Sequence, residues 1–276
     1  MKMGWSSVVV FVPTVLVVLN FLVVRLSVRS NDEFWLNVGN QLEAAAPSFI
    51  YDCFKAGRQA HMAAWFDKES KTGTVYMHEA SGWKYLTEKQ YSNMVKHVLH
   101  WLPIKSGHRI FELGCGVGAA LNVTMETYGP NLILGGSDIS ADFIKKCQKY
   151  FPKFADNFYH LSMTSANEKV PDSSQDHVLS FGALGMYLYR EEMTAAVAEA
   201  VRILKPGGGM CLTHFIEPNG RNPGSILQPV EKSHWEKVRD KHGLERMRLV
   251  TLLNQGNFGD RYAVCFTKKR LLLVQR

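Results

Sequence analysis

Several features that mark other protein classes are missing from this 276-residue chain. The formal net charge is +7, but the lysines and arginines are scattered and no run of five basic residues occurs. Scattered charge is more typical of a solvated basic surface than of a nucleic-acid interface. The chain also lacks internal repeats, low-complexity segments and any tight group of His, Cys and Asp with metal-ligand spacing. We therefore expect a globular protein that binds neither nucleic acid nor a metal ion.

Cysteine is scarce, and its spacing shows no pairing motif. The five cysteines are odd in number and form no C-x-x-C pair: Cys53, Cys115, Cys147, Cys211 and Cys265. Three of them, Cys147, Cys211 and Cys265, fall in segments that we predict to be helices or strands, where buried free thiols are common. This pattern favours a cytosolic location for the globular part of the chain.

One long hydrophobic run is present at the N-terminus. Residues 3–24 contain no charged side chain, and this length suffices to cross a bilayer as a helix, although Pro13 and Asn20 weaken it. A cleaved signal or organelle-targeting segment is the alternative, but no A-x-A-like site follows and the run ends directly at Arg25. We expect residues 1–29 to be a single transmembrane helix that anchors the protein in a membrane. Positive charges on its two sides nearly balance, so its orientation stays open.

The rest of the chain divides into two parts by pattern. Residues 30–85 are rich in aromatic and small residues with helix-like spacing, which predicts two or three short helices. From residue 86 onward, strand and helix signals alternate, which predicts a parallel, doubly wound α/β sheet. We predict helices at 86–101, 141–150, 191–204 and 233–242, strands at 108–111, 132–138, 158–163, 177–181 and 210–215, and a final hairpin of 245–253 and 262–267.

The most informative segment is F-E-L-G-C-G-V-G, residues 111–118. It joins a short apolar strand to a helix through a glycine-rich turn, a geometry that holds nucleotide-like ligands. Gly114, Gly116 and Ala119 alone would also fit a dinucleotide-binding pattern. Glu112, however, places a carboxylate at the end of the strand, where it would repel a pyrophosphate. A carboxylate there suits a cofactor with a cationic amino-acid group, such as S-adenosylmethionine.

Two later segments complete a recognisable series. The second predicted strand ends in Asp138, which is placed to accept hydrogen bonds from ribose hydroxyls. The turn L-K-P-G-G at residues 204–208 precedes the fifth predicted strand. In this order, over roughly residues 85–270, the motifs resemble those of class I S-adenosylmethionine-dependent methyltransferases, most closely the small-molecule branch with a methyltransferase-11/25-like domain. A nicotinamide-dependent oxidoreductase is the main alternative, disfavoured by Glu112 and by the absence of a Tyr-x-x-x-Lys pair after the fourth strand.

The resemblance implies a fold and a domain organisation. The fold is a Rossmann-like, doubly wound sheet of seven strands with an antiparallel last strand, formed by residues 86–276. Residues 30–85 would form a helical cap over the cofactor and substrate pocket, behind the anchor at residues 1–29. The oligomeric state is left open.

The resemblance also implies cofactor contacts at the carboxyl ends of the strands, where open α/β sheets bind their ligands. Glu112, Gly114, Gly116 and Gly118 would face the amino-acid group of S-adenosylmethionine. Asp138 and Ile139 would face the ribose and the adenine, and Phe181 would form a wall near the sulfur. The family often has an acid after its third strand that contacts the adenine; this chain has none, so Met163 or Thr164 is expected to take that place.

The acceptor is predicted to be a small organic molecule. No Asn/Asp-Pro-Pro-Tyr motif of the amide- and adenine-directed enzymes follows the fourth strand. Methyl transfer to an oxygen, nitrogen or sulfur atom is expected, with a thioether or a hydroxy or amino acid metabolite among the candidates. His214, at the end of the fifth strand, is the candidate general base, which a thioether would not need. A protein or peptide acceptor is the alternative. The candidate substrate contacts are Tyr76, His78, Trp83, Tyr85 and Tyr187.

Overall fold

The structure, a computed structural model, describes a large part of the chain after residue 56. The described residues are 57, 59–60, 62–64, 66–68, 77–79, 83, 86–165, 169–184, 188, 190–216, 230–252 and 261–270. The chain divides into two units, Met1–Trp65 and Phe66–Arg276, and the fold below is that of the second. The predicted anchor at residues 1–29 lies outside the described residues. In the part of the chain that the structure describes, no helix is both long and apolar enough to cross a membrane.

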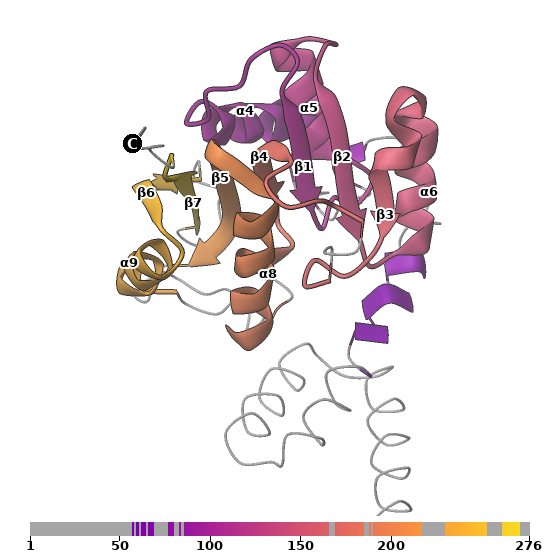
Figure 1. Cartoon of the computed structure of the whole chain (residues 1–276). Helices are drawn as coiled ribbons and strands as arrows, with labels where there is room; N and C mark the ends of the chain where they lie inside the picture. The colour runs from indigo at the N-terminus through magenta and orange to yellow at the C-terminus, as the bar shows by residue number, and fades with distance from the viewer. Residues whose placement is uncertain are drawn as a thin grey trace, which may run out of the picture. The chain divides into compact units, whose positions relative to one another are not determined.

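A seven-stranded mixed sheet forms the centre of the second unit (Figure 1). Its strand order is β3-β2-β1-β4-β5-β7-β6, with β1 to β5 parallel and β7 antiparallel to both of its neighbours. This arrangement confirms the predicted Rossmann-like sheet with an antiparallel last strand. The strands are β1 Arg109–Leu113, β2 Ile133–Asp138, β3 Phe158–His160, β4 Gln175–Ser180, β5 Leu204–Ile216, β6 Leu244–Thr251 and β7 Arg261–Lys268.

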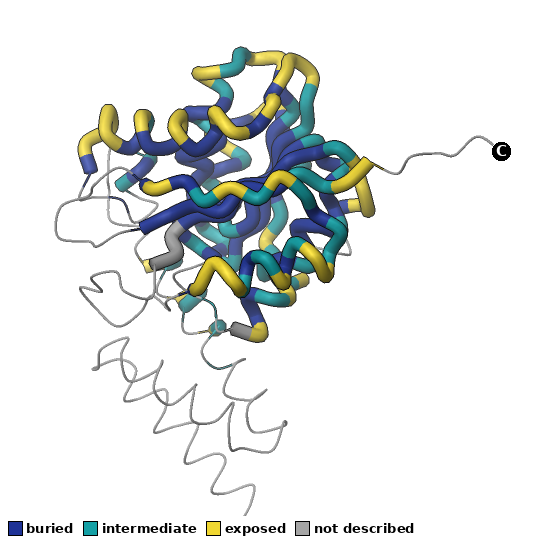
Figure 2. The backbone as a smooth tube through the Cα atoms, turned by 90° about the vertical axis from the view of Figure 1, so that its left-hand side faces the viewer, coloured by how far each residue is buried: buried dark blue, intermediate teal, exposed yellow. Residues whose placement is uncertain are grey.

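Helices cover both faces of the sheet because alternate strand residues point to opposite sides. Ile110 and Leu134 pack with buried residues of α4, α5 and α6, whereas Phe111 and Val178 pack with those of α8 and α9. Figure 2 shows the result, a buried sheet between helices whose outer sides are exposed. The helices are α4 Glu88–Leu99, α5 Ala119–Tyr128, α6 Ala141–Tyr150, the 3-10 helix η2 Pro152–Asn157, α8 Arg190–Ile203 and α9 Lys232–Lys241.

Local signals account for most of these boundaries. The helix α4 begins after Thr87, whose side chain accepts a hydrogen bond from the Gln90 N–H while the Gln90 side chain accepts one from the Thr87 N–H. The helix α6 has the predicted bounds. The strand β3 is shorter than predicted because the chain turns at Ser162, whose carbonyl accepts the Ser165 N–H at 3.0 Å. The strand β5 begins earlier than predicted, because Leu204 already pairs with Gln175 of β4.

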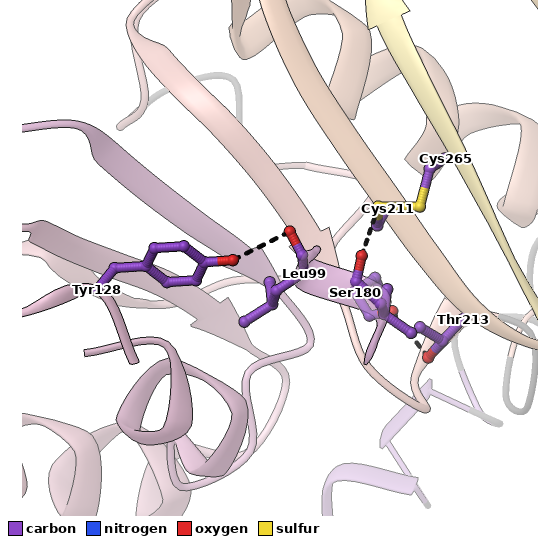
Figure 3. The surroundings of a disulfide bond; sticks show 7 residues. Leu99, Tyr128, Ser180, Cys211, Thr213 and Cys265 are labelled. Carbon is purple, nitrogen blue, oxygen red and sulfur yellow. Dashed lines mark hydrogen bonds between the residues drawn. A yellow bond between two sulfur atoms is a disulfide. The ribbon is translucent and has the colours of Figure 1, made fainter. Parts of the chain in front are cut away.

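Two of the cysteines correct the sequence-based expectation of free thiols. Cys211 of β5 and Cys265 of β7 stand directly opposite each other, with their Cα atoms 4.2 Å apart, and form a disulfide (Figure 3). Cys115 and Cys147 are buried free thiols. The spacing of the cysteines held no signal for the bond, because the register of β5 and β7 brings the two together.

Candidate active site

At two positions of the glycine-rich turn after β1, both the backbone conformation and the surrounding space require glycine. Gly114 and Gly118 adopt φ angles of +70° and +83°, in the left-handed region that side chains rarely tolerate. Space is also lacking: a Cβ on Gly114 would lie 2.9 Å from Cε of Met163, and one on Gly118 would lie 2.5 Å from Cε2 of Phe151. The turn is therefore packed from both sides, with Met163 close to its first glycine.

Asp138, at the end of β2, bonds to this turn directly. Its Oδ2 accepts the Gly116 N–H at 2.8 Å, and its Oδ1 accepts the Ser140 N–H at 2.9 Å. Burial raises the pKa of Asp138 to about 6, although these two N–H groups act to lower it. The sequence suggested only a ribose contact, so this link between β2 and the turn was missed. Each carboxylate oxygen keeps a further lone pair that could accept a ribose hydroxyl.

Glu112 is a buried carboxylate with an unused acceptor. Its side chain is 2% exposed, and its Oε2 has no hydrogen-bond partner. Burial raises the pKa of Glu112 well above its ordinary value; the Phe181 N–H opposes that rise and the charge of Asp138 adds to it. A buried carboxylate is costly unless a cation or several donors compensate for its lost hydration. Glu112 therefore fits a ligand that brings a positive charge to the glycine-rich turn.

Buried polar atoms without partners gather near this edge of the sheet. Among the described residues there are four: Glu112 Oε2, Ser137 Oγ, Ser180 Oγ and His177 Nδ1. The first three belong to the carboxyl-terminal parts of β1, β2 and β4, the side on which open α/β sheets bind ligands. Native proteins leave few such atoms unpaired, so the group is consistent with a ligand-binding edge.

The other predicted cofactor contacts differ in their surroundings. The hydroxyls of Thr164 and Ser162 lie 2.9 Å apart, so the Thr164 hydroxyl already has a partner. Ile139 is half-buried, and its carbonyl lies 3.0 Å from Nε2 of His160. Phe181 is buried at the end of β4. Of the two expected to face the adenine, Met163 is the one that the structure places against the glycine-rich turn.

Two of the residues predicted to contact the acceptor, His78 and Trp83, lie within the described part of the chain. His78 stacks on Tyr91 of α4 at 5.5 Å, and its Nε2 lies 2.9 Å from the Leu86 carbonyl, contacts that suit a structural role. Trp83 also packs against Tyr91, and a Cβ on Gly182, after β4, would lie 2.9 Å from its Cζ2. Trp83 thus lies beside the end of β4.

Four predicted acceptor contacts stay predictions. Tyr76, Tyr85 and Tyr187 lie outside the described residues. His214 belongs to β5, but its side chain is likewise outside what the structure describes.

Sequence reasoning assigned no contact to two side chains that support the site. Asp67 accepts a hydrogen bond from the Ser140 hydroxyl at 2.5 Å, at the start of α6. Thr213 accepts the Gly182 N–H at 2.9 Å. It also donates to the Ser180 carbonyl at 3.1 Å (Figure 3), and the two bonds brace the turn after β4. Asp67 lies 73 positions from Ser140 in the sequence, and Thr213 lies 31 positions from Gly182 and 33 from Ser180. No local sequence pattern could therefore predict these contacts.

Comparison with known proteins agrees with this geometry. Residues 110–208, which contain the glycine-rich turn and Asp138, match the model of a methyltransferase domain family. The chain carries a class I S-adenosylmethionine-dependent methyltransferase domain. The solved structure of magnesium protoporphyrin IX methyltransferase from Synechocystis PCC 6803 aligns with a TM-score of 0.54 over 77% of this chain and 97% of that one. At 14% identity, this similarity concerns the fold alone.

Curated relatives of this methyltransferase domain have different acceptors. The chain is 31% identical over 115 residues to tRNA N(3)-cytidine methyltransferase METTL2 of Danio rerio, covering 40% of this chain and 32% of the relative. It is 30% identical over 144 residues to phosphoethanolamine N-methyltransferase 1 of Triticum aestivum, covering 51% and 28%. The chain thus spans about a third of the length of these relatives. Their names include one nucleic-acid acceptor and one small-molecule acceptor.

Proposed function

We propose that this protein transfers a methyl group from S-adenosylmethionine to an oxygen, nitrogen or sulfur atom of a small organic acceptor. The observation that carries the proposal is Glu112, a buried carboxylate with a free acceptor atom beside a glycine-rich turn. Its unmet need for a cation matches the amino group of S-adenosylmethionine and conflicts with the pyrophosphate of a dinucleotide. When bound, the cofactor supplies a methyl group that its positive sulfur has already activated.

The residues of this chain would then bind the cofactor, orient it toward the acceptor and exclude water from the site. Glu112 would pair with the amino group, and the remaining lone pairs of Asp138 would accept the ribose hydroxyls. Met163 would lie at the adenine side, and Phe181 would shield the reacting carbon from water. An in-line displacement gains most from such positioning, because holding the reactants in the reactive geometry removes an entropic barrier.

The acceptor would lie between the end of β4 and the cap. Trp83 against Gly182 supplies a flat apolar wall there, which supports a small acceptor. Tyr76, Tyr85 and Tyr187 complete the proposed acceptor contacts, whereas the contacts of His78 with Tyr91 and Leu86 suit a structural role. His214 would take the proton from a hydroxyl or amine as the methyl group arrives. A thioether loses no proton and would need no such base.

The proposed location follows from the sequence alone. The hydrophobic run at residues 3–24 would hold the protein in a membrane. Full-length protein should then resist alkaline carbonate extraction. Recovery of a mature chain that begins after residue 24 would identify a cleaved segment instead.

The central experiment is a titration of the full-length protein with S-adenosylmethionine and, separately, with NADH. Binding of S-adenosylmethionine alone supports the proposal, whereas binding of NADH alone overturns it. Methyl-labelled cofactor is then incubated with three acceptor pools: small metabolites, peptides and tRNA. The tRNA pool is included because of the METTL2 similarity over 115 residues. Label in the peptides or the tRNA, and none in the metabolites, would retain the methyltransferase and reject the small acceptor.

A further inference from the structure

Gly116 is held from two sides, through the two peptide groups that meet at its Cα atom. Its N–H donates to Oδ2 of Asp138 at 2.8 Å, from β2. Its carbonyl accepts a hydrogen bond from Sγ of Cys147 at 3.2 Å, from α6. Gly116 is buried, so a carbonyl without a donor there would be costly. The orientation of the peptide between Gly116 and Val117 thus depends on one residue of the next helix.

Cys147 is one of two side chains from α6 and its C-terminal end that pack against the glycine-rich turn. A Cβ on Gly118 would lie 3.4 Å from Sγ of Cys147 and 2.5 Å from Cε2 of Phe151. Cys147 and Phe151 are four residues apart, one helical turn, so they present one continuous surface to the turn. Cys147 is fully buried, and its neighbours hold it in place.

A second thiol is nearby but is less well placed. Sγ of Cys115 lies 3.7 Å from the Gly116 carbonyl and 3.9 Å from Sγ of Cys147. Burial, and then the hydrogen bond with Cys147, raise the pKa of the Cys115 thiol well above its ordinary value, so this group stays protonated. Of the two thiols, Cys147 makes the shorter hydrogen bond to the Gly116 carbonyl.

We propose that Cys147 is a positioning residue for the cofactor. Its thiol holds the peptide between Gly116 and Val117, and Asp138 holds the peptide between Cys115 and Gly116. Together the two contacts fix the backbone angles of Gly116, and the Gly116 N–H in turn holds the rotation of the Asp138 carboxylate. The lone pairs of Asp138 then point away from the turn, toward the ribose of the bound cofactor. The inference rests on the proposed function, because it assigns Cys147 to the binding of S-adenosylmethionine.

The test compares Cys147→Ser with Cys147→Ala in the full-length protein. The two side chains are close in size and both lose the sulfur, but only serine can donate to the Gly116 carbonyl. The dissociation constant of S-adenosylhomocysteine is measured by calorimetry, with the free energy of unfolding from urea titration alongside. We expect the alanine protein to bind about fivefold more weakly than the serine protein, the value of one neutral hydrogen bond. The serine protein should stay within about twofold of the unaltered protein.

The control is Ile144→Val on the same helix, which removes one methyl group from the core. It should lower stability with no change in affinity. Equal affinities of the serine and alanine proteins, with both folded, would overturn the inference and leave the proposed function intact. Absence of binding by the unaltered protein would overturn the proposed function instead. If the alanine protein does not fold, Cys147→Val, which fills the space without a donor, replaces it.

Discussion

Polar groups at the two ends of the parallel strands differ in how fully they are hydrogen-bonded within the chain. At the carboxyl end, Glu112 and Asp138 are buried acids whose pKa values are raised, and Oε2 of Glu112 has no partner. At the amino end, Asp176 accepts the Arg109 N–H at 2.8 Å and the Lys205 ammonium at 2.8 Å. Burial acts to raise the pKa of Asp176, but these two donors bring it below its ordinary value.

Two histidines at the amino end also contact each other, although Nδ1 of His177 has no partner. Nδ1 of His108 accepts the Lys105 N–H at 3.2 Å and lies 3.0 Å from Nε2 of His177. The amino end therefore satisfies most of its polar groups within the chain and stabilises the fold. The carboxyl end leaves its acids without full compensation, which is the state that a cationic ligand relieves. Residues at the amino end thus serve the stability of the fold, and residues at the carboxyl end serve ligand binding.

The largest effect is expected from Gly114→Ala at the carboxyl end. The new Cβ would collide with Ala183 and Met163, and the φ angle of +70° adds strain. We expect no detectable binding of S-adenosylmethionine by calorimetry. Gly129→Ala is the matched control, because Gly129 also has a positive φ, of +96°, but nothing within 4 Å of the added Cβ. Equal affinities of the two variants would remove the turn from the site.

The two ends should also respond to pH in opposite directions. Burial raises the pKa of Asp138 from 3.8 to about 6, so its contribution to stability is full below pH 3.8 and is lost as the pH rises through 6. Burial lowers the pKa of His177 from 6.5 to about 4, so its contribution is full above pH 6.5 and is lost as the pH falls through 4. Each difference is worth about 3 kcal/mol.

Urea unfolding of two variants between pH 4 and pH 6.5 separates these contributions. Compared with the His177→Gln protein, the Asp138→Asn protein should have a free energy of unfolding that falls toward pH 4. The reason is that only the penalty of protonating His177 remains in it. His177→Gln should gain stability toward pH 4, because only the relief of protonating Asp138 remains. Groups away from these two sites titrate alike in both variants, so parallel pH profiles would contradict the opposite roles.

A smaller effect is expected from Asp138→Asn on the cofactor. The amide loses the charge and turns a donor toward one of the two N–H groups that the carboxylate now accepts. Charged hydrogen bonds of this kind contribute about 1.5–3 kcal/mol, so calorimetry should show S-adenosylmethionine affinity falling by about ten- to a hundredfold. A folded variant with unchanged affinity would show that Asp138 serves the turn and not the ribose.

The smallest effect on binding belongs to Asp176→Asn, the counterpart at the amino end. Loss of its charge weakens the contact with Lys205, which is partly exposed and so contributes only about 0.5–1 kcal/mol. We expect that loss in urea unfolding, with S-adenosylmethionine affinity unchanged within about twofold. A clear loss of affinity would show that the amino end also contributes to cofactor binding, and the distinction between stability and binding residues would be wrong.

Much of the cofactor half could be predicted from short segments. The glycine-rich turn, Glu112 and Asp138 were found because a strand, a turn and a helix start follow one another within a few residues, and each leaves a local signal. The bounds of α6 followed from the same kind of signal. The second function of Asp138, bonding the Gly116 N–H, was not found, because its partner lies on another strand-to-helix connection.

The sequence by itself determined the element order and the place of the cofactor turn, because periodicity, caps and glycines act over a few residues. The antiparallel last strand was expected only from the resemblance to the methyltransferases. Only the tertiary structure decided which distant side chains meet. Cys211 reaches Cys265 across 54 positions, Asp67 reaches Ser140 across 73 and Cys147 reaches Gly116 across 31. Such contacts depend on strand register and helix packing, which arise from the whole core and leave no trace in local spacing.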